Sequence, residues 1–78
     1  MYYEADDFDI TIKEITYNKF ADKVYTVIFE AEYNYFGWDD KEKHNQADRN
    51  IFEFKNESLT IDEIKEECAK RMAKMLTD

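Results

Sequence analysis

The sequence predicts an α+β fold, in which a three-stranded antiparallel β-meander carries one C-terminal α-helix packed on one face. Two observations predict this βββα layout. Three separate stretches alternate apolar with polar residues, which is the period of a β-strand with one buried face. A further stretch, at the C-terminal end of the chain, repeats its apolar residues at helical spacing and follows a helix-capping sequence.

The first strand is expected over residues 8–17, and its alternation reverses part-way along. Apolar residues occupy one phase as far as Ile12 and the opposite phase from Ile15 onward. One extra residue in a strand moves every later side chain to the other face. We therefore expect a β-bulge near Lys13 and Glu14.

The second strand is expected over residues 23–36 and shows the clearest alternation. Its even-numbered positions are mixed, and its apolar face consists of Tyr25, Val27, Phe29, Ala31, Tyr33 and Tyr35. The third strand is expected over 49–55, with Phe52 and Phe54 facing the core. Short connections at residues 18–22 and 56–60 favour antiparallel neighbours.

A connection of about twelve residues would then separate the second and third strands, and connections of that length are uncommon. The second strand is also longer than the usual five to six residues. We therefore expect the two strands to extend as a ribbon beyond the helix, with Phe36 and Trp38 near its end.

The helix is expected over residues 61–76. Thr60 and Glu63 form a capping-box sequence, and Leu59 is placed to pack on Ile64 across the cap. At about 100° per residue, one narrow stripe gathers the apolar residues Ile61, Ile64, Cys68, Met72 and Met75. A single stripe is typical of a helix that covers one face of a sheet.

Length and composition indicate one domain, 1–78. Apolar residues make up 44% of the chain and aromatic residues 17%, which is too many for a disordered segment. Cys68 is the only cysteine, which fits a reducing compartment or a place in the core. The acidic N-terminus is unlike a signal peptide, and no apolar run is long enough to span a membrane. We expect a cytoplasmic protein.

The net charge of −8 is unevenly distributed. Residues 1–40 carry ten acidic and three basic side chains, whereas residues 41–78 carry nine acidic and eight basic ones. Such a chain would be repelled by nucleic acid and by anionic lipid, so its electrostatic partner is a basic protein surface. The alternative is that the acidity only keeps a small domain in solution.

The candidate partner-binding residues are acids on the exposed side of the first two strands, together with aromatic and acidic residues where the second strand ends. They are Glu4, Asp6, Asp7, Asp9, Glu30, Glu32, Phe36, Trp38, Asp39 and Asp40. Glu30 and Glu32 share one strand face, about 6.6 Å apart at the usual rise of a strand. A row of carboxylates on a rigid sheet can present negative charge as a phosphate backbone does. Phe36 and Trp38 are either an exposed anchor or part of the rim of the core.

Catalysis, metal binding and cofactor binding have little support in the sequence, so we expect a protein that is not an enzyme and binds neither metal nor cofactor. His44 has no identifiable partner, and Cys68 lies on the apolar stripe of the helix. The acidic run after Gly37 lacks the glycine and the final glutamate of an EF-hand loop.

One triplet resembles an enzyme site. Glu53 and Lys55 lie two apart on a strand, with Asp39 and Asp40 upstream. This resembles the carboxylate and lysine constellation of magnesium-dependent nucleases. Alternation along an amphipathic strand produces the same triplet, so the nuclease is kept as a remote alternative.

In size and charge the chain is similar to small acidic phage-encoded inhibitors, among them anti-CRISPR proteins. The leading hypothesis is a non-enzymatic inhibitor that occupies a basic nucleic-acid-binding surface of a partner protein by nucleic-acid mimicry, in the host cytoplasm if it is phage-encoded. The main alternative is a structural or housekeeping domain that forms a homodimer through the apolar residues of its other sheet face, which are Val24, Ile28 and Ile51.

Overall fold

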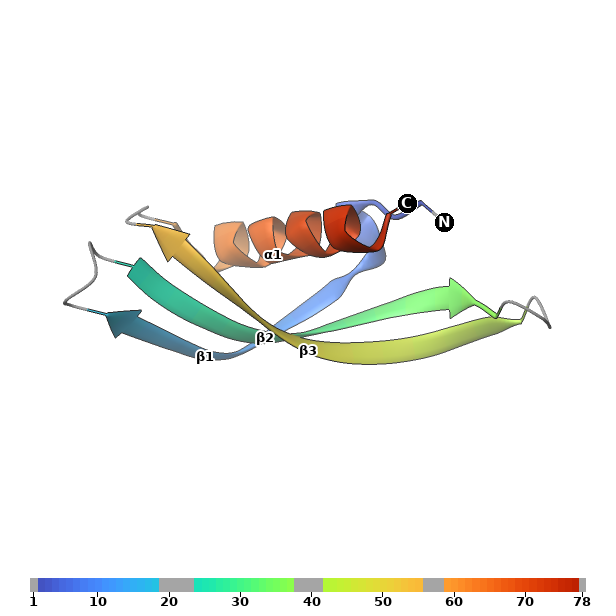
Figure 1. Ribbon diagram of the computed structural model, residues 1–78, viewed down its shortest axis with the longest axis horizontal. Coiled ribbons are helices and arrows are strands. Elements are labelled where there is room, and N and C mark those ends of the chain that lie inside the picture. Colours follow the sequence, from blue (N-terminus) through green and yellow to red (C-terminus); the bar gives the residue numbers. More distant parts are fainter. Residues whose placement is uncertain (1, 19–23, 38–41, 56–58, 78) are drawn as a thin grey trace.

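The computed structural model describes residues 2–18, 24–37, 42–55 and 59–77. A short 3₁₀-helix, η1 (Ala5–Asp7), precedes the strands β1 (Asp9–Asn18), β2 (Val24–Phe36) and β3 (Lys43–Lys55), and the helix α1 (Ile61–Leu76) follows them. The strands form one antiparallel sheet in the order β1-β2-β3. Figure 1 shows α1 lying across one side of this twisted sheet. The predicted βββα fold is confirmed.

The predicted bulge is present in β1. The register of β1 against β2 shifts between Ile12 and Glu14, so that Lys13 has no directly opposed residue. After the shift, Ile15 pairs with Val27 and therefore returns to the side of the sheet that α1 covers. The bulge explains why apolar residues change phase within a strand that keeps one buried face.

The predicted start of the third strand at residue 49 is wrong, because β3 begins at Lys43 and pairs with β2 without interruption. Only residues 37–42 connect the two strands, not about twelve. The additional residues of β3 are almost all polar, so hydrophobic alternation could not reveal them. His44, expected in a loop, stacks on Tyr35 across the ribbon with ring centroids 5.3 Å apart.

The expected ribbon is present beyond the end of β1. The last pair between β1 and β2 joins Asp9 to Glu32, whereas β2 and β3 stay paired as far as Phe36 and Lys43. We call the part of β2 and β3 past the Asp9–Glu32 pair the distal ribbon. It gives the molecule its elongated shape, with principal extents of 49 × 19 × 19 Å, and it projects past α1 in Figure 1.

The core lies between α1 and the odd-numbered side of β2, which we call the inner face. The aromatic rings of Phe29 and Phe52 meet there at 5.2 Å between centroids. Tyr33 is buried beside Phe8, and its hydroxyl donates a 2.6 Å hydrogen bond to Asp48. That acceptor satisfies the one polar group that Tyr33 carries to the edge of the core.

The helix begins as predicted and buries a wider arc than predicted. Thr60 Oγ1 accepts from the Glu63 N–H at 3.1 Å, and Glu63 Oε1 accepts from the Thr60 N–H at 3.1 Å, which completes the capping box. The buried residues of α1 are Ile64, Cys68, Ala69, Met72 and Ala73. Ile61 and Met75 lie in the first and last turns and are exposed, contrary to the predicted stripe. The helix packs beside η1 as well as across the sheet.

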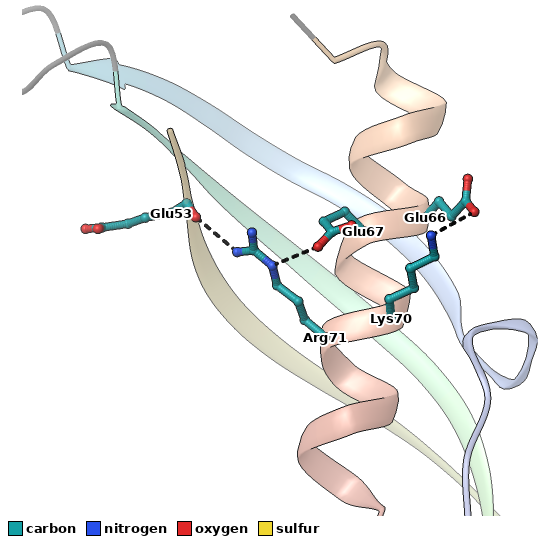
Figure 2. A network of polar contacts seen from close by, with 5 residues as sticks. All are labelled: Glu53, Glu66, Glu67, Lys70 and Arg71. Carbon is teal, nitrogen blue, oxygen red and sulfur yellow. Dashed lines mark hydrogen bonds and ion pairs between the residues drawn. The ribbon is translucent and has the colours of Figure 1, made fainter. Parts of the chain in front are cut away.

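Arg71 connects α1 to β3. Its guanidinium lies 4.2 Å from the centre of the Phe54 ring, and Arg71 Nη1 donates to the Glu53 carbonyl at 3.0 Å. Figure 2 shows this reach, together with the 3.4 Å contact between Arg71 Nε and Glu67. The Glu53 carboxylate points away from Arg71 in the same view. Arg71 therefore closes the open side of the core with a cation–π contact and a main-chain hydrogen bond.

The buried position of Cys68 can be tested by measuring the stability of the protein at alkaline pH. Burial raises the pKa of its thiol from 9.0 to about 11, so the folded state keeps a proton that the unfolded chain releases. Stability is therefore complete below the unfolded pKa and is lost as the pH rises toward the folded pKa. Between pH 7 and pH 10 the free energy of unfolding should fall by about 1 kcal/mol on account of Cys68.

Urea unfolding at the two pH values measures this loss. Cys68→Ala should cost on the order of 1 kcal/mol at pH 7 and should then show a smaller alkaline loss than the natural chain. Rapid labelling of the native thiol by a bulky reagent, or equal alkaline losses in both proteins, would contradict the buried position.

Candidate protein-binding face

The side of the sheet opposite α1, which we call the outer face, is not covered by any of the described residues. It consists of the even-numbered residues of β2 and of the residues paired with them on β1 and β3. Alternation along β2 puts the core residues on the inner face and leaves Glu30 and Glu32 outside. The predicted partner-binding face is therefore a continuous surface across all three strands.

Three of the candidate acids meet on this face. Asp9 is directly opposed to Glu32 across the β1–β2 pair, and Glu30 follows Glu32 on the same side of β2. Directly opposed residues of antiparallel strands have Cα atoms about 4.5–5.5 Å apart, so Asp9 and Glu32 occupy neighbouring positions on this face. We call Asp9, Glu30 and Glu32 the acidic triad.

Hydrogen bonds fix one member of the triad. Asn45 Nδ2, on the neighbouring β3, donates to Glu32 Oε1 and to Asn34 Oδ1, each at 3.3 Å. These bonds hold the Glu32 side chain toward β3. The Asp9 carboxylate lies across β2 from this contact, since β1 and β3 flank β2 on opposite sides.

Basic side chains limit the acidic surface on one side. Arg49 on β3 is directly opposed to Glu30, and Lys43 and Lys55 occupy the two ends of β3 on the outer face. The paired positions of β1 and β2 carry Glu14 in addition to the triad. Sequence reasoning missed Arg49 and Glu14, because their positions on this face depend on strand register and on the bulge. The negative charge of the outer face is therefore concentrated on its β1–β2 half.

The other N-terminal acids lie elsewhere. Asp7 Oδ2 accepts from the Glu4 N–H at 2.8 Å, and the Asp7 N–H donates to the Glu4 carbonyl at 3.0 Å. These bonds close η1, which packs against α1. Glu4, Asp6 and Asp7 thus lie beside α1 and outside the acidic triad, and Asp7 also lines a hollow that it shares with Phe36.

Phe36 is an exposed aromatic residue at the end of β2, with 60% of its surface accessible. It borders a hollow of about 270 Å³ lined by Tyr2, Tyr3, Asp7, Asn34, Phe36 and Lys43. Gly37 N–H donates to the Glu42 carbonyl at 3.0 Å and closes the ribbon just beyond it. Of the predicted aromatic and acidic tip, Trp38, Asp39 and Asp40 lie outside the described residues.

Of the nuclease-like pattern, the structure describes Glu53 and Lys55, whereas Asp39 and Asp40 lie outside the described residues. Glu53 is opposed to Thr26 on β2, ten residues before Phe36 on the same strand. At about 3.3 Å per residue, Glu53 is therefore about 33 Å from the end of β2. Among the described residues, no group of three or more histidine, cysteine or acidic side chains is arranged to hold a metal ion.

The remote nuclease hypothesis has a direct test. Purified protein with Mg²⁺ or Mn²⁺ should leave single-stranded and double-stranded DNA and RNA intact, because the described residues include no group of acidic side chains arranged to hold a metal ion. Gel electrophoresis after prolonged incubation measures this. Cleavage that disappears in both Glu53→Gln and Lys55→Ala would favour the nuclease hypothesis over the binding protein.

Comparisons of the chain with protein-family models, with curated proteins and with solved structures found no match. No helix in the described part of the chain has both the length and the apolar character that a membrane crossing requires. The function is therefore inferred from the geometry of the outer face.

Proposed function

We propose that the chain is a small acidic, non-enzymatic binding protein that occupies a basic nucleic-acid-binding surface of a partner protein. The observation that carries this proposal is the acidic triad. Asp9 and Glu32 are directly opposed on an uncovered sheet face, and Glu30 is the next residue on that side of β2. The charge of −8 on 78 residues supports the same kind of partner.

The like-charge pair favours the binding of a basic group. Two acids at directly opposed positions of antiparallel strands repel and lower the stability of the sheet. A lysine or arginine bound on this face near Asp9 and Glu32 reduces that repulsion and gains from both charges. Counterions gathered on the acidic face and on the partner's basic groove are released when the two surfaces meet, as they are when protein binds DNA.

The distribution of charge sets the approach of the partner. Arg49 faces Glu30, and Lys43 and Lys55 also lie on β3, so a basic surface would be repelled from that side. We infer that the partner covers the β1–β2 half of the outer face. Phe36 lies four residues beyond Glu32 on the same side of β2, past the end of that half, and supplies an apolar anchor there, as aromatic residues commonly do at interfaces.

An inhibitor of this kind would compete with nucleic acid for the partner. The likeness in size and charge to phage-encoded anti-defence proteins, anti-CRISPR proteins included, points to a nucleic-acid-handling complex of a bacterial host as the target. In that setting the protein would act in the host cytoplasm.

Removing charge from the triad tests the proposal. The partner is first captured from a lysate of the organism that encodes the chain. Glu30→Gln with Glu32→Gln should lower the association rate about threefold to tenfold and reduce the dependence of binding on salt, because exposed charges act mainly on encounter. Surface plasmon resonance at two salt concentrations measures both effects.

A matched control removes the same charge from another surface. Asp62→Asn with Glu66→Gln takes two negative charges from exposed positions on α1, which lies on the other side of the sheet. This control should change the association rate much less than the double change in β2. Equal effects of the two pairs would mean that only net charge matters and that the triad is not the binding site.

Self-association through the outer face remains the alternative function. Ile28 and Ile51 are directly opposed there, and Ile51 is 55% exposed. However, Glu14 is opposed to Ile28 on β1, and Glu53 is two residues from Ile51 on the same face. Two copies packed face to face would bring these acids together in a desolvated interface, which is costly. A dimer that Ile28→Lys dissociates would favour this alternative.

A further inference from the structure

The two edges of the sheet differ. β1 forms one edge, and its bulge at Lys13 interrupts the regular spacing of main-chain groups that another strand would need. β3 forms the other edge and pairs with β2 in perfect register over all of Lys43–Lys55. A long regular edge strand is a template for pairing with a further strand.

The hydrogen bonding at the end of the ribbon shows which groups of β3 face this open edge. Gly37 N–H bonds to the Glu42 carbonyl, so the even-numbered residues of β3 direct their N–H and C=O groups toward β2. The odd-numbered residues of β3 then direct theirs away from the sheet. The contact between Arg71 and the Glu53 carbonyl agrees with this assignment.

Side chains of the protein block one half of this edge. Arg71 Nη1 donates a hydrogen bond to the Glu53 carbonyl at 3.0 Å, and the Asn50 side chain accepts one from the Ile51 N–H at 2.9 Å. Within residues 42–55 and the other described ranges, no side chain bonds to the outward N–H or C=O groups of the other half. These belong to Lys43, Asn45, Ala47 and Arg49. The open half of the edge lies on the ribbon side, and Figure 1 shows β3 at the margin of the sheet there.

We propose that residues 45–49 of β3 pair with the same residues of a second copy, antiparallel about a twofold axis at Ala47. Two three-stranded sheets would then join into one continuous sheet. An axis at Ala47 makes its N–H and C=O exchange hydrogen bonds with those of the other Ala47. Pairing through identical segments is the usual form of a symmetric dimer interface.

Side-chain complementarity selects this register. Gln46 of one copy faces Asp48 of the other, and the structure already has Gln46 Nε2 donating to Asp48 at 2.7 Å within one chain. Asn45 faces Arg49, and the Lys43 stem lies over Ile51. No like charges are opposed.

The neighbouring registers oppose like charges. An axis at residue 46 places Lys43 against Arg49, an axis at 48 places Asp48 against itself, and an axis at 49 places Arg49 against itself. An axis at 45 sets Glu42 against Asp48. Opposed like charges destabilise a strand pair, so the pairing about Ala47 is the favoured one.

Charge also favours a second copy over the basic partner proposed above. Along Lys43–Lys55 the basic residues Lys43, Arg49 and Lys55 slightly outnumber the acidic residues Asp48 and Glu53. This edge therefore does not attract a basic strand, unlike the β1–β2 half of the outer face. Repulsion between the two copies, each of charge −8, weakens with salt, so the dimer should strengthen as the salt concentration rises.

Proline at the symmetry axis tests the proposal. The Ala47 N–H points away from β2, so Ala47→Pro breaks no hydrogen bond between β2 and β3 and is tolerated on an edge strand. It removes both central hydrogen bonds of the dimer, and the dissociation constant should rise about tenfold or more. Ala47→Val keeps the N–H and should keep the dimer.

Sedimentation equilibrium over a wide range of protein concentration, at low and high salt, measures this association. The expected result is a dimer that salt strengthens and Ala47→Pro dissociates, while the thermal melt of the dilute monomer is nearly unchanged. A monomer at every concentration and salt overturns the proposal. So does a dimer that survives Ala47→Pro.

Discussion

Replacing Phe29 by alanine is expected to unfold the domain. Phe29 is 0% exposed at the centre of β2, where its ring meets Phe52. Truncating a buried phenylalanine costs about 3–5 kcal/mol, because contacts are lost and a cavity remains. A domain of this size has a net stability of only about 3–5 kcal/mol, so little folded protein should be left at room temperature.

Circular dichroism and the dispersion of amide resonances measure the loss. Phe36→Ala is the matched control, because it makes the same change in the same strand at a 60% exposed position. It should alter the free energy of unfolding by no more than about 0.5 kcal/mol. If Phe36→Ala destabilises as much as Phe29→Ala, the assignment of the two faces of β2 is wrong.

Phe36→Ala should instead weaken binding to the captured partner by about 2 kcal/mol or more. Phe36 lies four residues beyond Glu32 on the same side of β2, where a docked surface that extends past the acidic triad would exclude water from its ring. Removing an apolar anchor acts mainly on the dissociation rate, in contrast to removing rim charges, which slows association. Binding kinetics at one salt concentration separate the two effects.

Tyr17→Ala is the matched control for this experiment. Tyr17 is 52% exposed, so its truncation also removes an accessible aromatic ring. It pairs with Tyr25 on the inner face, near the end of β2 opposite to Phe36. We expect it to leave the affinity nearly unchanged. An equal loss in both variants would show that Phe36 is not a specific anchor.

Local patterns in the sequence determine most of this fold. The capping box at Thr60 and the phase reversal near Lys13 each depend on a few neighbouring residues, and both are confirmed in the structure. The early part of β3 was not predicted, because residues 43–48 are almost all polar on both sides and carry no hydrophobic period. Pairing with β2 determines that segment, and pairing is not a local property.

On the candidate face, too, some features follow from local sequence patterns and others depend on strand pairing. Alternation alone places Glu30 and Glu32 on one side of β2. The opposition of Asp9 to Glu32 and of Arg49 to Glu30 depends on register, which turn lengths and the bulge set. Sequence order also grouped Glu4, Asp6 and Asp7 with the sheet acids, whereas η1 carries them to the helix side.

Displacement of nucleic acid from the partner tests the central claim most directly. The captured partner is loaded with a labelled nucleic acid, and the natural chain or the triple variant Asp9→Asn, Glu30→Gln, Glu32→Gln is added while anisotropy is followed. We expect the natural chain to release the nucleic acid and the triple variant, though folded, to release far less. A stable ternary complex of partner, nucleic acid and natural chain, or equal release by the triple variant, would contradict nucleic-acid mimicry by the acidic triad.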